Sequence, residues 1–413
     1  MTAHYYIHIP FCRQRCPYCK FALTPVFDDF KKRRYIEYLK KEIREYFLLS
    51  SRDTRDLLQG ADSSYRQNDK EAKKTIYFGG WTPSVLSHDE ILEVLECFPF
   101  YRESAIEITM EMNPEDVTPE YISGVLELGI NRISLWVQTL NETSLSEIHR
   151  SDRDTIFHAI ESISSILSSR GRPFAKHWKY PWGARDLPQW ADSSYCQNDK
   201  REEKEISLNI DFILGLPFVK PGETLAGIQE LHERFPYITH TSVYMLEDEE
   251  YPKHWRANSI TEDEMQSEFL EIMDYFESIG WHHYELSNFS KKWYESLHNQ
   301  AYWEHSDTRG FGLSAASFEW WKRWSNSSSF NGYYEWKRDN EEKLTQDQIQ
   351  IEQMMFGLRR DGIKIQNSKL QIQSKKTREL EEAGLIEIME NTIKPTKTWI
   401  FVIDHILSEL ISD

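Results

Sequence analysis

Six short runs rich in β-branched and aromatic residues recur in the first 250 residues, and a helical pattern follows each of them. The runs span residues 5–9, 75–78, 107–111, 132–135, 207–212 and 241–244. Strands that alternate with helices predict a parallel sheet. No obvious dinucleotide-binding motif accompanies them, so we expect an α/β fold, a partial TIM-like (β/α)6 barrel with its site at the carboxyl ends of the strands.

The chain changes character beyond about residue 250, where it becomes aromatic-rich and irregular. We expect a barrel over 1–250 and a second, α+β domain over 251–413. The end of that domain is similar to a winged-helix unit, with a helix that closes at Gly384, a strand over 385–389 and a last helix through Leu410. A structural cap is favoured over DNA binding because the chain is acidic.

Two polar insertions are expected to loop out of the barrel, at about 50–74 and 168–204. They contain an internal repeat, because RDLLQGADSSYRQNDKEAKK (55–74) closely matches RDLPQWADSSYCQNDKREEK (185–204). Two copies are too few for a repeat architecture. Insertions of this composition are tolerated between a helix and the next strand.

The excess of acidic over basic residues restricts the partners that the chain can have. The chain has 67 acidic and 49 basic residues, a formal net charge of -18. Such a surface repels phosphate backbones and anionic lipid, so nucleic acid is not expected as a partner, and membrane contact is expected only through recipient proteins. Neither a signal peptide nor an apolar stretch of membrane-spanning length is present, which predicts a cytoplasmic protein.

Three of the five cysteines lie within eight residues, directly after the first predicted strand. Cys12, Cys16 and Cys19 have the spacing CxxxCxxC, which lets three thiolates hold one [4Fe-4S] cluster and leaves one iron open. An open iron can bind S-adenosylmethionine (SAM) through its amino and carboxylate groups. The alternative is a structural zinc site with His8 as fourth ligand, but such sites usually pair their ligands as CxxC. Cys97, in an apolar helical stretch, is interpreted as a packing residue.

The motifs resemble one known family along nearly the whole chain. They are YIHIPFCRQRCPYCKF with its Tyr6, FGGWTPS, EITMEMNP, NRISLWVQTLN, NIDFILGLP, YELSNF, HNQAYW, RGFGLSAASF and MMFGLRRDG. In this order they resemble the oxygen-independent coproporphyrinogen III oxidase family of radical SAM proteins. The resemblance implies a reduced cluster that cleaves SAM to a 5′-deoxyadenosyl radical.

The resemblance also implies a set of SAM-binding residues. Gly79, Gly80 and Thr82 would line the methionine end of SAM, and Tyr18 would flank the adenine. Tyr6 precedes the cluster loop as part of the same site. The rest of SAM, or a second molecule of it, would be held by Glu111, Gln138, Arg150 and Asp211. Taken singly, each of these polar residues is also consistent with an ordinary position at the rim of a barrel.

Within the family, the porphyrinogen-oxidising enzymes have a fourth cysteine one residue after the third, where this chain has Lys20 and Phe21, and an N-terminal extension. Both differences resemble the heme chaperone branch, which implies heme as a ligand, heme-recipient proteins as partners and a reductant such as flavodoxin or ferredoxin. The branch's HNxxYW pattern is matched by His298, Asn299, Tyr302 and Trp303.

His298 could ligate heme iron with Tyr302 and Trp303 against the macrocycle. The alternative for this histidine is a hydrogen-bonded core residue. At the level of function, the alternatives to a chaperone are a coproporphyrinogen III oxidase and a binding protein that does not use SAM.

Tryptophan stands at two positions where the family has glycine, Trp81 and Trp136, and Trp399 is a third candidate. Within the repeat, Gly60 of the first copy corresponds to Trp190 of the second. The chain has 17 glycines in 413 residues, below the usual share of about 7%, and 14 tryptophans. We therefore hypothesise that UGA encodes glycine in this gene.

Further cases would be Trp293, Trp320 and Trp321, whereas Trp303 belongs to a tryptophan motif. The rival explanation is a degenerate paralogue that has lost SAM, since an indole at position 81 would occupy the space of the methionine end. UGG codons at positions 81, 136 and 190 would exclude the hypothesis.

Overall fold

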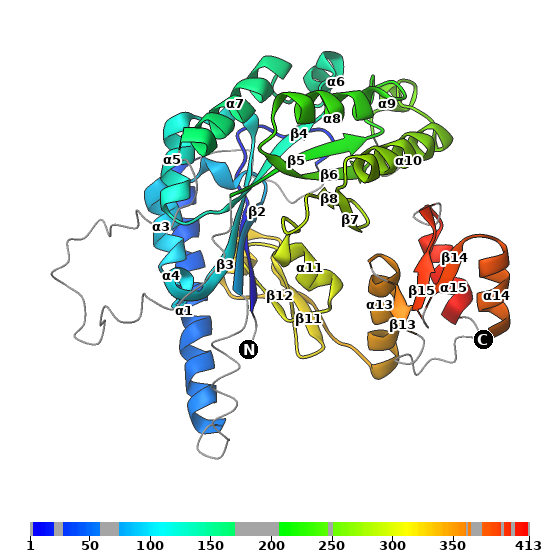
Figure 1. Ribbon diagram of the computed structural model, residues 1–413. Coiled ribbons are helices and arrows are strands. Elements are labelled where there is room, and N and C mark those ends of the chain that lie inside the picture. The colour runs from blue at the N-terminus through cyan, green and yellow to red at the C-terminus, as the bar shows by residue number, and fades with distance from the viewer. Residues whose placement is uncertain are drawn as a thin grey trace, which may run out of the picture.

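The computed structural model describes residues 3–19, 28–57, 74–169, 206–246, 251–360, 362–364, 374–389, 392–397 and 401–411. Its main element is a 12-stranded sheet in the order β12-β11-β10-β9-β1-β2-β3-β4-β5-β6-β8-β7 (Figure 1). The strands β1 to β6 are neighbours and parallel, which confirms the six predicted strands and the partial barrel. Their bounds are His4–Ile9, Lys74–Gly80, Ala105–Met112, Arg132–Gln138, Ser207–Leu214 and Ile238–Met245.

Helices follow these strands and cover the outer face of the sheet (Figure 1). They are α1 (Asp29–Leu57), α3 (His88–Leu95), α4 (Tyr101–Ser104), α5 (Pro119–Glu127), α6 (Glu142–Glu147), α7 (Arg153–Ser169), α8 (Glu223–Arg234), α9 (Lys253–Arg256) and α10 (Glu262–Ser278), with short 3-10 turns at Pro83–Val85 and Pro114–Asp116. Capping boxes at Ser87 and Thr261 satisfy the first amides of α3 and α10.

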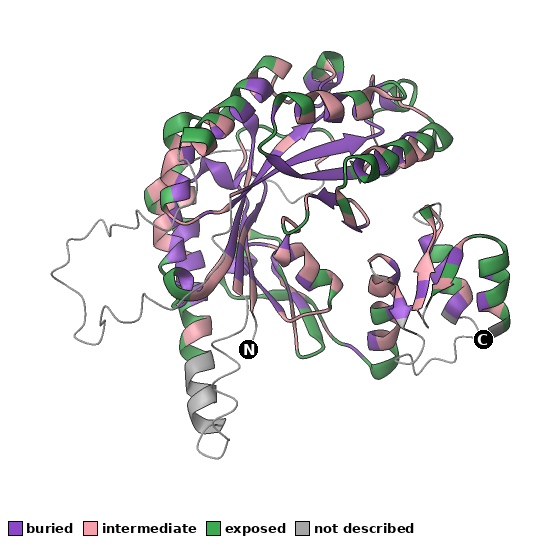
Figure 2. Ribbon diagram, viewed as in Figure 1, coloured by how far each residue is buried: buried purple, intermediate pink, exposed green. Residues whose placement is uncertain are grey.

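The two faces of the parallel strands differ in chemistry. On β2, Ile76 and Phe78 are fully buried in the core under the helices, whereas Thr75 and Tyr77 alternate with them and point to the inner face. Figure 2 shows the parallel strands as mostly buried, with exposed residues along the outer sides of the helices. The alternation places the polar side chains of the strands inside the barrel.

The sheet continues past the expected domain boundary at residue 250. Strand β9 pairs in parallel with β1, β8 pairs antiparallel with β6, and the remaining strands extend the two edges. The added elements are β7 (His282–Glu285), β8 (Asn288–Ser290), α11 (Leu297–Trp303), β9 (Thr308–Phe311), β10 (Ala316–Glu319), β11 (Lys322–Asn326), α12 (Phe330–Tyr334) and β12 (Arg338–Lys343). Residues 282–343 therefore share a sheet with the barrel, and the division at 250 remains only a prediction about domains.

The last part of the chain forms a small α+β unit, as the winged-helix expectation requires. Its elements are α13 (Gln346–Leu358), β13 (Ile363–Lys364), α14 (Ser374–Glu382), β14 (Ile386–Met389), β15 (Thr392–Pro395) and α15 (Ile403–Ile411). The three strands form an antiparallel sheet in the order β13-β15-β14, over a core that includes Leu358, Ile393 and Ile406. The turn expected at 390–391 lies outside the described residues.

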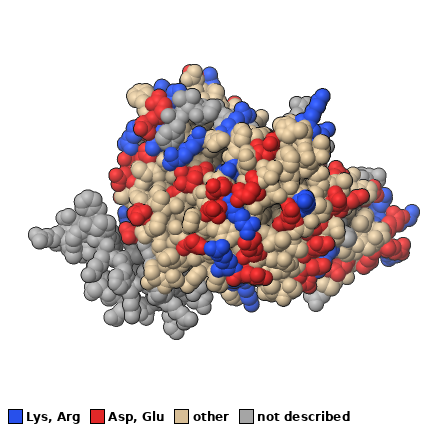
Figure 3. Space-filling view, turned by 90° about the horizontal axis from the view of Figure 1, so that it is seen from above, with Lys and Arg blue, Asp and Glu red and all other residues tan. Residues whose placement is uncertain are grey.

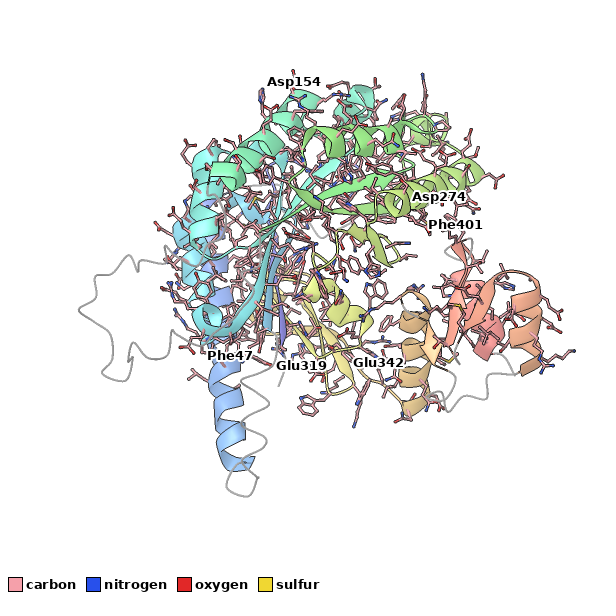
Figure 4. All side chains as sticks on the ribbon, viewed as in Figure 1. Phe47, Asp154, Asp274, Glu319, Glu342 and Phe401 are labelled. Atoms are coloured by element: carbon pink, nitrogen blue, oxygen red, sulfur yellow. The ribbon has the colours of Figure 1, made fainter. Side chains whose placement is uncertain are left out.

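Ion pairs of Lys397 with Asp274 and Glu277 and an aromatic contact join this unit to α10. Lys397 forms an ion pair with Asp274 at 2.8 Å, and the Phe401 ring lies 6.0 Å from that of Phe269. Figure 4 labels Asp274 and Phe401 on the facing sides of the two parts.

The polar insertions fall largely outside the described residues. Helix α1 continues to Leu57, so the start of the first expected insertion is helical. Within the described part of the chain, no helix is long and apolar enough to cross a membrane.

The surface seen from above carries intermixed acidic and basic side chains (Figure 3). Helices α7 and α8 are joined by ion pairs of Arg153 with Glu230 and of Arg234 with Glu161. Exposed pairs of this kind each contribute about 0–1 kcal/mol, so the fold depends on its core rather than on them.

Candidate cofactor site

One cavity of about 420 Å³ opens at the carboxyl ends of the parallel strands. It brings together eight residues that the sequence predicted as ligands or cofactor contacts, namely Cys12, Cys16, Cys19, Tyr18, Glu111, Gln138, Arg150 and Asp211. They come from the loop after β1, from β3, β4 and β5, and from the segment after α6. The position agrees with the expectation for a (β/α) barrel.

The cysteine loop is fastened to the barrel at three points. Arg13 forms an ion pair with Asp116 at 2.9 Å, and Arg150 donates to the Tyr18 hydroxyl at 3.1 Å. The Thr82 hydroxyl lies 3.2 Å from the Cys12 sulfur, as a donor to it. These contacts hold the loop over the cavity, so its three thiols face one space.

The donor set fits an iron–sulfur cluster. All three thiols line the cavity, and three thiolates of a [4Fe-4S] cluster bind three different irons rather than one atom. Among the described residues, no group of three or more His, Cys, Asp or Glu is arranged to hold a single metal ion. Burial raises the pKa of Cys16, and the nearby Arg150 partly offsets this effect.

Glu111 lies on the inner wall of the barrel with two hydrogen-bond donors. The Tyr77 hydroxyl donates to one carboxylate oxygen at 2.8 Å, and the backbone amide of Gly80 donates to the other at 3.1 Å. Burial raises the pKa of Glu111 to about 8, with Asp211 adding to the rise. At neutral pH this carboxyl therefore favours its protonated form.

We predict that Glu111 makes folding stability fall as pH rises. Its folded pKa of about 8 exceeds the ordinary value of 4.5, so the folded state binds the extra proton between these values and loses relative stability as pH rises through that window. Replacing Glu111 with glutamine should raise the melting temperature relative to the parent chain at pH 8.5 more than at pH 5. The exposed Glu120→Gln serves as control, and an equal effect of Glu111→Gln at both pH values would contradict the prediction.

Two residues that line the cavity have polar atoms without hydrogen-bond partners among the described residues. Among the described residues, the buried Oε1 of Gln138 and Nη2 of Arg150 have no hydrogen-bond partner. Asp211 accepts hydrogen bonds from Ser134 at 2.6 Å and Asn209 at 2.8 Å. Buried polar groups are usually paired, so unsatisfied atoms beside a cavity fit a polar ligand such as SAM.

The two glycines of the predicted SAM motif do not line the cavity. A Cβ at Gly79 would lie 2.8 Å from the rings of Tyr6 and Tyr77. Gly80 has a φ of +111°, and a Cβ there would lie 2.9 Å from the His8 ring. Packing and backbone geometry thus account for both glycines in this structure. Tyr6 likewise lies outside the cavity, where its hydroxyl is 3.2 Å from His8 Nδ1.

Two tryptophans occupy the cavity wall instead. Trp81 is 3% exposed, and its indole nitrogen has no partner among the described residues. The Trp136 ring lies 5.2 Å from the Arg150 guanidinium carbon. These are two of the positions where the sequence resemblance predicts glycine.

Six further wall residues were not predicted as site residues: Gln14, Arg15, Tyr77, Ser134, Ile213 and Tyr244. Tyr77 and Ser134 are hydrogen-bonded to predicted residues, and the Tyr244 side chain is 43% exposed. Tyr77, Ser134 and Tyr244 belong to predicted strands, Ile213 lies one residue beyond the strand predicted over 207–212, and Gln14 and Arg15 belong to the cysteine loop. Inward alternation along these strands could have identified the tyrosines and the serine.

The predicted heme residues lie on α11, which packs against the amino-terminal part of β2. His298 is 1% exposed, with Nδ1 2.8 Å from the Thr75 hydroxyl and Nε2 3.2 Å from the Tyr302 hydroxyl. Its ring is also tilted against Tyr77 at 5.0 Å. This is the bonding of a core histidine, whereas Tyr302 is 44% exposed and Trp303 half-buried.

Comparison with known proteins first places the chain in a class. The model described as "Radical SAM superfamily" matches residues 6–169, the segment that carries the cysteines and the strands β1 to β4. The solved coproporphyrinogen III oxidase of Escherichia coli, described as a radical SAM enzyme, superposes with a TM-score of 0.69 over 99% of this chain and 90% of that one, at 18% identity. Residues 6–169 are therefore similar to the radical SAM superfamily, and the chain shares the fold of this enzyme.

The more specific similarity is to heme chaperones. The chain is 27% identical to heme chaperone HemW of Lactococcus lactis over 86% of this chain and 81% of that protein. It is 27% identical to heme chaperone HemW of Bacillus subtilis over 86% of this chain and 83% of that protein. It is 26% identical to heme chaperone HemW of Escherichia coli over 75% of this chain and 68% of that protein.

Proposed function

We propose that this protein is a heme chaperone, which binds heme on a radical SAM scaffold and passes it to recipient proteins. The observation that carries the proposal is the similarity to heme chaperones of several bacteria over most of the chain. The cysteine motif supports it, because Cys19 is followed by Lys20 and Phe21 rather than by a fourth cysteine.

The cluster would be held by Cys12, Cys16 and Cys19. A [4Fe-4S] cluster supplies a reducible centre with one open iron, at which SAM can be bound and cleaved. Thr82, through its contact with the Cys12 sulfur, would orient that thiolate. A cytoplasmic reductant such as a flavodoxin or ferredoxin would supply the electron.

SAM would lie in the cavity between the cluster loop and the strand ends. The unsatisfied atoms of Gln138 and Arg150 are available to its polar groups. Glu111 and Asp211 also line this cavity, and Tyr18 is adjacent to the cluster cysteines.

Heme would approach His298 from the side of Tyr302. Burial lowers the pKa of His298 to about 3, so the imidazole is neutral, the form that binds iron. Its Nε2 is bonded only to the hydroxyl of the exposed Tyr302, since Nδ1 is taken by Thr75. Rotation of the Tyr302 ring would free this nitrogen, and Trp303 would pack near the macrocycle.

We predict that His298→Ala weakens hemin binding by about tenfold or more, an effect of at least about 1.4 kcal/mol. The measurement is a hemin titration of the anaerobically reconstituted protein, followed by Soret absorbance. Tyr302→Phe is the matched control, because it frees Nε2 while keeping the ring, and it should bind at least as tightly. If His298→Ala binds like the parent chain with an unchanged Soret position, His298 is not the ligand.

A second candidate function follows from Trp81, whose indole lies in the cavity wall. Taken as native, it favours a binding protein that does not use SAM. The absence of 5′-deoxyadenosine after reduction in the presence of SAM would support that candidate. Formation of coproporphyrinogen oxidation products under the same conditions would instead support an oxidase, the fold of which this chain shares.

A further inference from the structure

Four tryptophans of the described chain have a left-handed backbone. Their φ angles are +77° at Trp293, +54° at Trp320, +63° at Trp321 and +60° at Trp336. A bulky residue at positive φ is an outlier, because its Cβ crowds the neighbouring carbonyl, whereas glycine adopts this conformation without penalty. The local hydrogen bonding at each position shows which residue the backbone needs.

Trp320 and Trp321 form the whole loop of a two-residue hairpin. Strands β10 and β11 pair up to Glu319 and Lys322, which leaves only these two residues between them. Positive φ at both central residues defines a type I′ turn, which strongly prefers asparagine, aspartate and glycine. Two consecutive tryptophans are thus placed where the backbone favours glycine.

Trp336 occupies the position at which helices most often end in glycine. Its amide donates to the carbonyl of Tyr333 at 3.0 Å, and the next amide, of Lys337, donates to the carbonyl of Gly332 at 3.0 Å. This pair of bonds is the Schellman motif that closes α12, and the left-handed residue in it is usually glycine.

Trp293 is the third residue of a tight turn. The amide of Tyr294 donates to the carbonyl of Lys291 at 3.0 Å, which closes a four-residue turn. Positive φ at its third position is typical of a type II turn and calls for glycine. The Trp293 side chain is 78% exposed.

Other tryptophans of the described chain have no such backbone, and their rings are packed. Trp255 is 1% exposed and donates to Glu147 at 2.8 Å, and Trp324 is 6% exposed. Trp281 stacks on His232 at 4.6 Å, and Trp303 belongs to the HNxxYW motif. The two sets of tryptophans differ in backbone conformation, since the rings of Trp321 and Trp336 also have aromatic neighbours, His305 at 5.2 Å and Tyr38 at 6.2 Å.

We propose that residues 81, 136, 293, 320, 321 and 336 are glycine in the protein made by its own cells, encoded by UGA codons that these cells translate as glycine. For the four turn positions the proposal rests on backbone geometry alone. Its extension to positions 81 and 136 rests on the proposed SAM site, whose wall these two indoles form. The cofactor cavity of the native protein is then wider beside the cysteine loop.

Peptide mass spectrometry of the protein purified from its own cells tests the proposal, together with the codons of its gene. We expect glycine and UGA at all six positions, and tryptophan and UGG at positions 255, 281, 303 and 324. Tryptophan at the four turn positions would overturn the proposal. Glycine at the turns with tryptophan at 81 and 136 would overturn its extension to the cavity, and heme binding bears on neither result.

A stability measurement gives an independent result. A chain with Trp293→Gly, Trp320→Gly, Trp321→Gly and Trp336→Gly together should melt at a temperature higher by roughly 5 °C, because strain at four residues is removed. The matched control is Trp255→Gly, which should melt lower because it empties a buried position. A lower melting temperature of the fourfold variant would contradict glycine at these turns.

Discussion

Replacing Cys16 with serine is expected to abolish the iron–sulfur cluster. Three thiolates from one loop are the only protein ligands that the motif provides, and serine keeps the size of the side chain while removing its sulfur. The anaerobically reconstituted parent should contain about four iron atoms per chain and absorb in the visible range, and the variant should lose nearly all of both.

Cys97→Ser is the matched control for this experiment. Cys97 is buried on the outer side of the barrel, where its thiol donates to the Glu93 carbonyl at 3.3 Å, and it does not line the cavity. Its replacement should leave the iron content unchanged. A Cys16→Ser protein that still holds the parent's iron and visible spectrum would remove Cys16 from the ligand set.

The parallel strands were predictable because each is an apolar run with a helix after it. Their full lengths were not, since β2 extends to Gly80 through residues without strand propensity, held by pairing with β1. The strands that extend the sheet beyond residue 250 were missed for a related reason. Strand β9 has only four residues, and its pairing with β1, some 300 positions earlier, depends on tertiary contact rather than on local pattern.

The cluster loop could be predicted from the spacing of its three cysteines. Much of the cavity could be predicted because its residues lie at the carboxyl ends of the parallel strands. The roles of single residues were harder to predict. Glycine is required at position 79 because the rings of Tyr6 and Tyr77 leave no space for a Cβ atom. This contact exists only in the folded barrel and could not be read from the sequence. His298 matches a motif in sequence, yet its two nitrogens are bonded to Thr75 and Tyr302, a fact that depends on the distance between β2 and α11.

The chain with glycine at positions 81 and 136 is expected to bind SAM at least about 100-fold more tightly than the chain with tryptophan, a difference of about 2.7 kcal/mol. The physical reason is steric, because both indoles line the cavity in which SAM is proposed to bind. Equilibrium dialysis of the reconstituted proteins with labelled SAM would measure it, and equal affinities would contradict it.

The stability of single variants also distinguishes native glycine from native tryptophan at position 81. Removing a tryptophan from a core that evolved around it costs about 3–5 kcal/mol, because a cavity remains. At position 81 the buried indole nitrogen has no partner among the described residues, so replacement by glycine removes an unsatisfied donor as well as a side chain. We therefore expect Trp81→Gly to cost much less than Trp255→Gly, whose indole is hydrogen-bonded to Glu147. A large loss of stability at position 81 without a gain in SAM affinity would identify Trp81 as native, and the protein as one that binds its ligand without SAM.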